Sequence, residues 1–153
     1  MPAEIPGLVD EFSMEIGYRC RSTAILPDPD EADDDALVEH PGKALGQPGS
    51  RAPHVELAPG RSTLDLFGLG FVLLTGDCGQ PWQEAAAAAA RRGLPVIAPL
   101  AGIGSDGIAA AYGIGPAGAA LVRPDGFVGW RSRGGAADPA AELSQALTRL
   151  LAR

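Results

Sequence analysis

One cysteine occupies the position in this sequence where redox chemistry is most plausible. Cys78 lies in the stretch TGDCGQPW, residues 75–82, between an apolar run and an alanine-rich segment. A thiol at the N-terminus of a helix ionises more readily, and the thiolate is the reactive form. Pro81 stands three positions on, where the second cysteine of a Cys-x-x-Cys redox pair would be. We interpret Cys78 as part of a structural turn and keep a reactive thiol as the alternative.

Two other residues bear on that alternative. Thr75 stands three residues before Cys78, which is the spacing that a thiol peroxidase would use. The surrounding proline pattern of such an enzyme is absent, and no matching arginine can be identified. Cys20 could act as a distant resolving thiol. The thiol hypothesis therefore rests on Cys78.

Histidine and acidic side chains offer weaker catalytic candidates. His54, in RAPHVEL, could act as a general base, but no Gly-x-Ser-x-Gly nucleophile occurs in the chain for it to activate. Asp65 and Asp77 lie close to the ends of predicted strands, and paired carboxylates can do acid–base work. For Asp77, beside a helix start, a capping or turn role is commoner.

The sequence predicts no metal site. Its two cysteines and two histidines lack the spacing of metal ligands. Asp28, Asp30 and Glu39 superficially resemble a calcium-binding loop, but Ala32 and Asp33 stand where a ligand and the turn glycine are required. We expect a solvated acidic loop instead.

The aromatic and basic residues near the end of a predicted hairpin suggest a contact surface. They are Phe127, Trp130 and Arg131. Aromatic residues and arginine are enriched among the residues that dominate binding energy at protein interfaces. A tryptophan in a hairpin is equally common in the core, so both possibilities stay open.

Size and charge narrow the class of protein. A chain of 153 residues fits one domain with a substantial core. The net charge of −7 disfavours nucleic acid, whose phosphates are bound by Lys and Arg. No apolar run approaches the roughly 20 residues needed to cross a bilayer, and the acidic start does not resemble a secretory signal. We expect a cytoplasmic protein that binds neither nucleic acid nor membrane.

Hydrophobic patterning predicts an alternating series of strands and helices. The predicted strands are residues 15–26, 61–68, 70–76 and 94–100, and a hairpin spans 118–132. The predicted helices are residues 81–93, a short one within 104–114, and an amphipathic one over 138–153 capped by Asp138. Residues 27–50 are rich in proline and acid and read as a mobile loop.

This order of elements predicts an α/β fold with a central mixed β-sheet flanked by helices. A crossover unit followed by a helix, a hairpin and a final helix is the thioredoxin-like arrangement. We assign residues 1–60 to an N-terminal strand and an extended acidic loop that packs on the domain. Residues 61–153 form the thioredoxin-like unit itself.

Four motifs in order carry a resemblance to a known family. They are GYRCRSTAIL, LGQPGSRAPHVEL, STLDLFGLGFVLLTG and YGIGPAGAALVRPDGFVGWR. Together they resemble the C-terminal domain of FAD-dependent aromatic-ring hydroxylases, the group that includes phenol hydroxylase and actinomycete polyketide hydroxylases. The resemblance extends from about residue 15 to the end of the chain.

The resemblance implies an accessory domain. In that family the segment is a thioredoxin-like appendage, usually not catalytic, that contributes to dimer contacts or supports the larger domains. The resemblance also implies structural hydrogen bonds for Arg51 and His54, whose loop lies against the main body in the family. It implies a packed site for Cys20, where the family usually has a tyrosine. The family's flavin site lies upstream, in a Gly-x-Gly-x-x-Gly turn and a later Gly-Asp motif that this sequence lacks. The glycines of GLGFVL lead into a strand instead of leaving one for a helix. We therefore expect no cofactor in this chain, and FAD only through a partner or a missing domain.

Three functions follow as hypotheses. The first is a non-redox accessory or dimerisation module, as a homodimer or with a flavoprotein monooxygenase, in the oxidation of aromatic polyketides or other aromatic compounds. The second is a thiol-dependent redox or peroxidase-like enzyme that uses Cys78. Against it, Gly118 stands where thioredoxins carry a cis-proline, and Pro116 lies two residues early. The third is a subunit of a split flavin monooxygenase.

Overall fold

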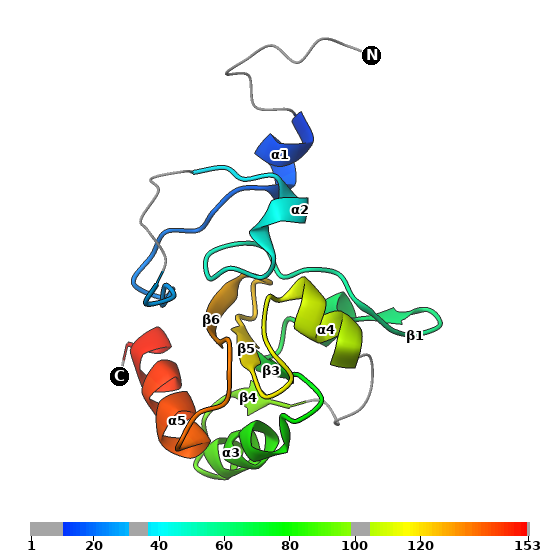
Figure 1. Cartoon of the computed structure of the whole chain (residues 1–153). Coiled ribbons are helices and arrows are strands. Elements are labelled where there is room, and N and C mark those ends of the chain that lie inside the picture. The colour runs from blue at the N-terminus through cyan, green and yellow to red at the C-terminus, as the bar shows by residue number, and fades with distance from the viewer. Residues whose placement is uncertain (1–10, 31–36, 99–104, 153) are drawn as a thin grey trace.

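A computed structural model describes residues 11–30, 37–98 and 105–152 of the chain. Its centre is a four-stranded sheet in the order β4-β3-β5-β6 (Figure 1). The strands are β3 (Phe71–Thr75), β4 (Val96–Ile97), β5 (Ala119–Val122) and β6 (Val128–Ser132). β3 runs parallel to β4 and antiparallel to β5, and β5 pairs antiparallel with β6. The predicted α/β class with a mixed sheet flanked by helices is confirmed.

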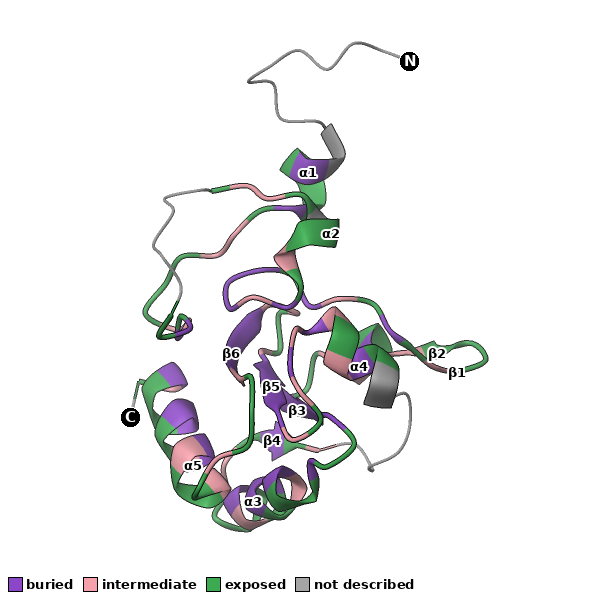
Figure 2. Ribbon diagram, in the orientation of Figure 1, coloured by how far each residue is buried: buried purple, intermediate pink, exposed green. Residues whose placement is uncertain are grey.

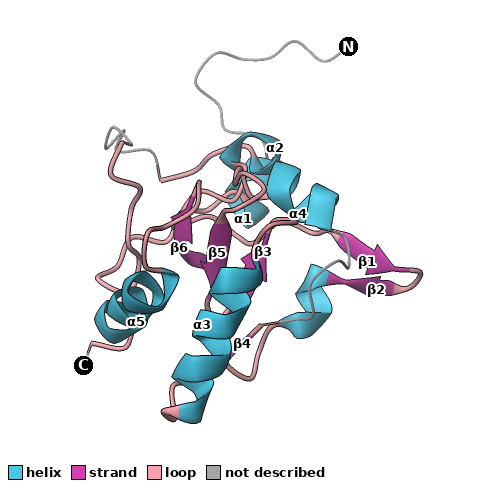
Figure 3. Ribbon diagram, turned by 60° about the horizontal axis from the view of Figure 1, so that its bottom comes forward, coloured by secondary structure: helices cyan, strands magenta, loops and turns pink. Residues whose placement is uncertain are grey.

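Helices cover both faces of the sheet. α3 (Gln80–Arg91) and α5 (Pro139–Leu150) lie side by side on one face, and α4 (Ser105–Ala111) covers the other (Figure 3). Since side chains alternate along a strand, neighbouring residues of one strand serve different faces.

The alternation divides the core into two apolar clusters. Leu73 and its cross-strand partner Leu121 face α3 and α5, where they join Trp82 and Leu147. Val72 and its partner Val122 face the other way and join Ile108 and Tyr112. Full burial of an apolar side chain of this size stabilises a fold by about 1.5–3 kcal/mol, so these two layers hold the sheet together.

Local signals set the helix and hairpin ends where the sequence predicts them. Pro81 lies in the first turn of α3, and the Asp138 carboxylate accepts the Ala141 N–H at 3.0 Å at the start of α5. Between β5 and β6, the Gly126 N–H donates to the Arg123 carbonyl at 2.9 Å. The predicted helices over 81–93 and 138–153 and the hairpin over 118–132 are therefore confirmed.

Two of the predicted strands are wrong. Residues 15–26 contain the end of α1 (Glu11–Ile16) and a turn, with a single bridge from Tyr18 to Val38. In residues 61–68, the two-residue strand β2 (Arg61–Ser62) pairs with β1 (Glu56–Ala58) and is followed by the 3₁₀ helix η1 (Thr63–Leu66). Ser62 and Asp65 form a capping box for η1, which favours a helical turn over an extended chain.

The N-terminal part of the chain closes the outer edge of β6. Gly49 and Ser50 exchange backbone hydrogen bonds with Val128, and the Leu26 N–H donates to the Gly129 carbonyl at 2.8 Å. The Ala52 N–H donates to Gly126 in the same way. A sheet edge paired like this no longer offers free backbone groups to other chains.

The remaining N-terminal elements lie away from the sheet. α1 and α2 (Pro41–Ala44) stand above it in Figure 1, and most of their residues whose burial is described are exposed, green in Figure 2. Residues 31–36, the centre of the predicted acidic loop, lie outside the described residues. The division of the chain at residue 60 stays a prediction.

Candidate functional site

The turn that holds Cys78 is built by its backbone. The Cys78 N–H donates to the Pro116 carbonyl at 2.8 Å, and the Gly76 N–H donates to the Gly118 carbonyl at 3.2 Å. A Cβ atom on Gly76 would stand 2.4 Å from the Pro116 oxygen, so only glycine fits there. The Cys78 side chain itself is exposed. The turn is therefore tight and self-supporting, and the thiol takes no part in holding it.

The residues around Cys78 also have structural roles. Thr75 is buried, and its hydroxyl accepts a long, 3.4 Å hydrogen bond from the Gln83 amide. A Cβ on Gly118 would lie 2.8 Å from the Ser132 oxygen, so this position packs against the end of β6. Asp77 is exposed and lies in the turn before α3, which confirms the turn role; it is not the cap, because α3 begins after Gly79 without a side-chain capping bond.

Cys20 lies at the other end of the sheet from Cys78. Its sulfur is 4.0 Å from an Arg123 nitrogen, just beyond the end of β5. Cys78 bonds to Pro116, which precedes the start of β5. The length of β5 separates the two thiols, and both are free. The alternative in which Cys20 resolves a Cys78 disulfide is therefore wrong for this arrangement.

The loop that carries His54 is fixed by other residues. The Thr63 hydroxyl donates to the Pro53 carbonyl at 2.9 Å and accepts the Val55 N–H at 3.0 Å. The Tyr112 hydroxyl donates to the same Pro53 oxygen at 3.0 Å. His54 points into solvent, so the expected structural hydrogen bonds are made by its neighbours.

Tyr112 and Thr63 are two buried polar residues that the sequence argument missed. Neither side chain has measurable exposure. Burial raises the pKa of the Tyr112 hydroxyl above its ordinary value near 10, while the hydrogen bond with Thr63 acts in the opposite direction. A tyrosine that stays neutral in this way serves as a hydrogen-bond donor inside the fold.

Trp130 and Arg131 do not form the exposed patch that was one of the two possibilities. Trp130 is 9% exposed and makes an edge contact with Trp82, with ring centroids 5.5 Å apart. Trp82 in turn donates its indole N–H to the Ala117 carbonyl at 2.9 Å. Phe127 is half-buried, and the Arg51 guanidinium stacks over its ring at 5.2 Å from the centroid. The core interpretation of this tryptophan is the correct one.

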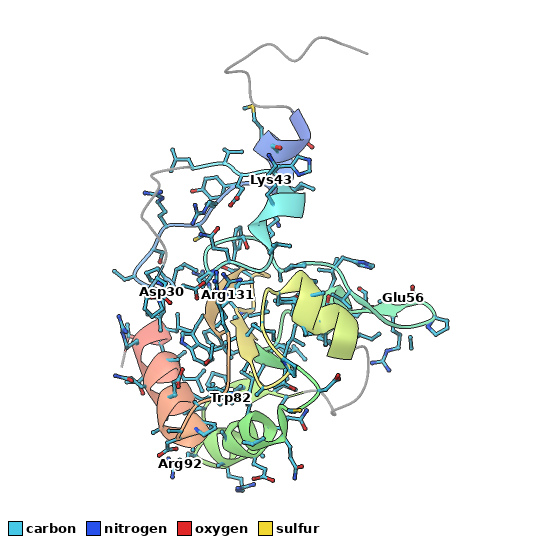
Figure 4. All side chains as sticks on the ribbon, viewed as in Figure 1. Asp30, Lys43, Glu56, Trp82, Arg92 and Arg131 are labelled. Carbon is cyan, nitrogen blue, oxygen red and sulfur yellow. The ribbon has the colours of Figure 1, made fainter. Side chains whose placement is uncertain are left out.

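Arg131 is the centre of a buried polar cluster. Its side chain donates to the Asp28 carboxylate through Nε at 2.7 Å and forms an ion pair through Nη2 at 2.6 Å. Nη1 donates to the carbonyls of Leu45 at 2.7 Å and Tyr112 at 2.9 Å. Arg133 approaches the same carboxylate at 3.5 Å from the surface. This one guanidinium joins β6, where Figure 4 labels Arg131, to three segments that are far apart in the sequence.

The position of Asp28 corrects the prediction of a solvated acidic loop at that residue. Asp28 is buried and neutralised by Arg131, whereas Asp30 is exposed. A carboxylate already committed to a guanidinium is a poor calcium ligand. No pattern in the sequence links residue 28 to residue 131, because the contact depends on how the chain folds back on β6.

A hollow lies beside this cluster. It measures about 330 Å³ and lies between residues 26–30, β6 and α5. Arg133 and Arg149 line it together with Asp30 and Glu142, so its charges are mixed. Within the described residues, no group of three or more His, Cys, Asp or Glu side chains is placed to hold a metal ion. None of the described helices is long and apolar enough to cross a membrane.

Comparison with known proteins gives this arrangement a context. The model for the C-terminal domain of aromatic-ring hydroxylases matches residues 46–153. The chain belongs to this family. The 4-methyl-5-nitrocatechol 5-monooxygenase of Burkholderia sp is 52% identical to it, over 98% of this chain and 29% of that enzyme. Aklavinone 12-hydroxylase of Streptomyces purpurascens is 45% identical, over 90% of this chain and 27% of the enzyme.

The structural comparison agrees with the sequence match. A crystal structure of aklavinone-11 hydroxylase, in a ternary complex with FAD and aklavinone, matches with a TM-score of 0.85 and 44% identity. The match covers 95% of this chain and 28% of that hydroxylase. The chain described here therefore spans less than a third of the length of these relatives. The predicted resemblance to the C-terminal domain of aromatic-ring hydroxylases is confirmed.

The described residues do not fit the phosphate-binding turn of an FAD site. Such a turn follows a strand and leaves glycine backbone open to the pyrophosphate at a helix N-terminus. Gly68 and Gly70 precede β3, and the Pro116 carbonyl occupies the space beside the Gly76 Cα. The expectation that FAD reaches this chain only through a partner or a further domain stays a prediction.

Proposed function

We propose that the chain is a non-catalytic accessory module of an FAD-dependent aromatic hydroxylase. One observation carries the proposal. Nearly the whole chain matches a segment that makes up 29% of the Burkholderia monooxygenase, and the family model that matches residues 46–153 describes the C-terminal domain of such enzymes. The relatives named above act on a nitrocatechol and on aklavinone, so the pathway would be the oxidation of a simple aromatic compound or of a polyketide.

The use of the polar side chains supports an accessory role. Asp65 serves a capping box, Arg131 serves a buried ion pair, and Tyr112 donates to a backbone carbonyl. Each is engaged in holding the fold rather than facing a common cleft. This pattern suits a module whose task is to be rigid and to contact a partner.

We also propose that the fold is thioredoxin-like. The order β4-β3-β5-β6, with β3 and β4 parallel and joined through α3, supports this assignment. The β5–β6 hairpin followed by α5 on the α3 face supports it as well. The fold would then be used without its redox chemistry, since Pro81 replaces the second cysteine.

The partner in this proposal is the flavin-binding body of such a hydroxylase, with a homodimer as the alternative. Nothing in the structure favours a separate flavin subunit over an attached one. A cytoplasmic location is expected from the sequence.

Two measurements test the accessory role. The purified chain, mixed with equimolar FAD and desalted, should be colourless and should not hydroxylate 4-methyl-5-nitrocatechol. The Burkholderia enzyme, with its matched segment replaced by this chain, should retain FAD better than the same enzyme with that segment deleted. A yellow isolated chain with stoichiometric FAD would contradict the proposal, and so would a deletion that has no effect.

The thiol alternative keeps one supporting observation, the exposure of Cys78 just before α3. An exposed cysteine without a partner does not define an enzyme. The rate at which the Cys78 thiol reacts with a disulfide reagent would distinguish a thiol enzyme from an accessory module.

A further inference from the structure

The hollow beside the Arg131 cluster contains one hydrogen-bond acceptor that the fold does not use. Asp28 lines this hollow, and its side chain is only 6% exposed. Arg131 contacts its carboxylate at 2.7 and 2.6 Å and Arg133 approaches at 3.5 Å, and all three contacts reach the same oxygen, Oδ2. Within the described residues, the other oxygen, Oδ1, accepts no hydrogen bond. Asp28 therefore keeps an acceptor without a donor.

That oxygen stays open to the hollow. Among the described residues, Glu39 Oε2 is the one enclosed side-chain polar atom without a hydrogen-bond partner. Because Asp28 Oδ1 also lacks a partner, it must be open to solvent, and the hollow is the space that Asp28 lines. A nearly buried acceptor costs free energy unless water or a ligand supplies the donor.

The neighbouring guanidinium determines which kind of donor fits. Arg131 already balances the charge of Asp28, so a cationic ligand beside Oδ1 would be repelled by that guanidinium. A neutral hydroxyl group meets no such repulsion, and its hydrogen bond to a carboxylate is a strong one. This end of the hollow therefore favours a ligand hydroxyl.

The wall next to Asp28 is apolar. Leu26, Trp130 and Ala146 line the hollow, and all three are largely buried in the core beneath it. A flat aromatic ring packs well against apolar side chains that include a tryptophan. The body of the ligand should therefore be a small aromatic ring.

The rim supplies a positive charge that is not yet paired. Arg149, in the last turn of α5, is exposed and lines the hollow. Its side chain makes no hydrogen bond or ion pair with any described residue. A carboxylate is the group that a guanidinium binds best. Asp30 and Glu142 also line the hollow and would repel further negative charge, so the ligand should carry one carboxylate.

We propose that the hollow binds a small phenolic acid, which is an aromatic ring with a hydroxyl group and one carboxylate. The hydroxyl donates to Asp28 Oδ1, the ring packs against Trp130, and the carboxylate pairs with Arg149. Figure 4 labels Asp30 and Arg131, two of the residues that line the hollow. Its volume of about 330 Å³ lies at the small end of the range for ligand sites and suits a single ring. This binding site goes beyond the proposed function and does not depend on it.

A nuclear magnetic resonance titration of the purified chain tests the site. The probes are the three hydroxybenzoate isomers, benzoate, and the methyl ester of the isomer that binds most tightly. At least one isomer should shift the Trp130 indole resonance and the backbone amides of residues 26–30, 131–133 and 145–149. Benzoate should bind at least about fivefold more weakly than that isomer, because it has no hydroxyl to donate to Asp28. This comparison tests the contact with Asp28 without disturbing the buried ion pair.

Arg149→Met, with Arg91→Met as its matched control, tests the contact at the rim. Both arginines are exposed and lie in the last turn of a helix, but Arg91 does not line the hollow. Arg149→Met should weaken binding of the hydroxybenzoate at least about threefold and change binding of its uncharged methyl ester by less than about twofold. Arg91→Met should leave the affinity for both compounds unchanged.

Four results would overturn the proposal. They are no saturable shift with any isomer up to about 10 mM, shifts confined to other parts of the chain, equal affinity for benzoate, and equal effects of the two arginine variants. Urea unfolding of both variants shows whether the fold is intact, and we expect equal midpoints. A midpoint lowered only in Arg149→Met would make Arg149 a structural residue and would overturn its contact with the carboxylate.

Discussion

The outer edge of β6 and the turn before α3 each place a chemically active side chain within a hydrogen-bonded framework. At the edge, the side chains make the connections, because Arg131 binds Asp28 and the carbonyls of Leu45 and Tyr112. At the turn, the backbone makes them, and Cys78 faces solvent. The comparison teaches that an arginine expected at an interface can instead stabilise the interior of the fold. A cysteine at the start of a helix can have a side chain that makes no structural contact.

The largest effect should come from breaking the buried ion pair. Arg131→Met leaves the Asp28 carboxylate buried without its main partner, and the exposed Arg133 approaches that carboxylate at 3.5 Å. Removing one partner of a buried pair costs about 3–5 kcal/mol, so the free energy of unfolding in urea should fall by about that amount.

Arg133→Met is the matched control for that variant. Arg133 approaches the same carboxylate at 3.5 Å, but its side chain is 60% exposed, so its removal should cost less than about 1 kcal/mol. An Asp28→Leu/Arg131→Met double variant should recover part of the loss, because no unpaired charge stays buried. Equal losses for Arg131→Met and Arg133→Met would show that burial does not distinguish the two arginines.

A smaller loss should follow when the turn is given a side chain it cannot hold. Gly76→Ala places a methyl group 2.4 Å from the Pro116 oxygen, which is backbone and cannot rotate away. Overpacking of this kind costs about 1–3 kcal/mol, measurable as a lower urea midpoint. Gly134→Ala supplies the control, since nothing lies within 4 Å of its added Cβ. A Gly76→Ala chain as stable as the control would mean that the turn is looser than its contacts indicate.

These two regions also show what the sequence could and could not predict. Strands β3, β5 and β6 and helices α3 and α5 follow from apolar runs, prolines and caps that lie within a few residues of one another. The Asp28–Arg131 pair and the Tyr112–Pro53 hydrogen bond join residues far apart in the chain, so no local pattern records them. The strand predicted for residues 15–26 is wrong for the same reason. An alternating pattern allows a strand, but a strand also needs a partner, and segment 49–52 already pairs with residues 126–128 at the edge of β6.

Tyr112, whose carbonyl accepts from Arg131 and whose hydroxyl binds Pro53, allows a test through pH. Its raised pKa means that the folded chain keeps the phenolic proton at pH values where the unfolded chain loses it. The unfolded state then binds fewer protons, so stability is fully present below the ordinary value near 10 and decreases as pH rises above it. Tyr112→Phe should cost about 1 kcal/mol at neutral pH, for the lost hydrogen bond to Pro53, and should weaken the alkaline decrease.

Urea unfolding on both sides of pH 10 measures this dependence. The exposed Tyr18 supplies the control, because Tyr18→Phe should leave the alkaline decrease in place. An unchanged alkaline slope in Tyr112→Phe would show that other groups cause it.

The smallest effect is expected at Cys78. Since its thiol is exposed and its backbone carries the turn, Cys78→Ser should change the free energy of unfolding by no more than about 0.5 kcal/mol. Its reaction with a disulfide reagent near neutral pH should match that of free cysteine, with the partly buried Cys20 slower in a Cys78→Ser background. Reaction far faster than free cysteine, together with a peroxidase or disulfide-reductase activity that Cys78→Ser abolishes, would favour the thiol enzyme. In that case the turn before α3 would be a functional site of the domain.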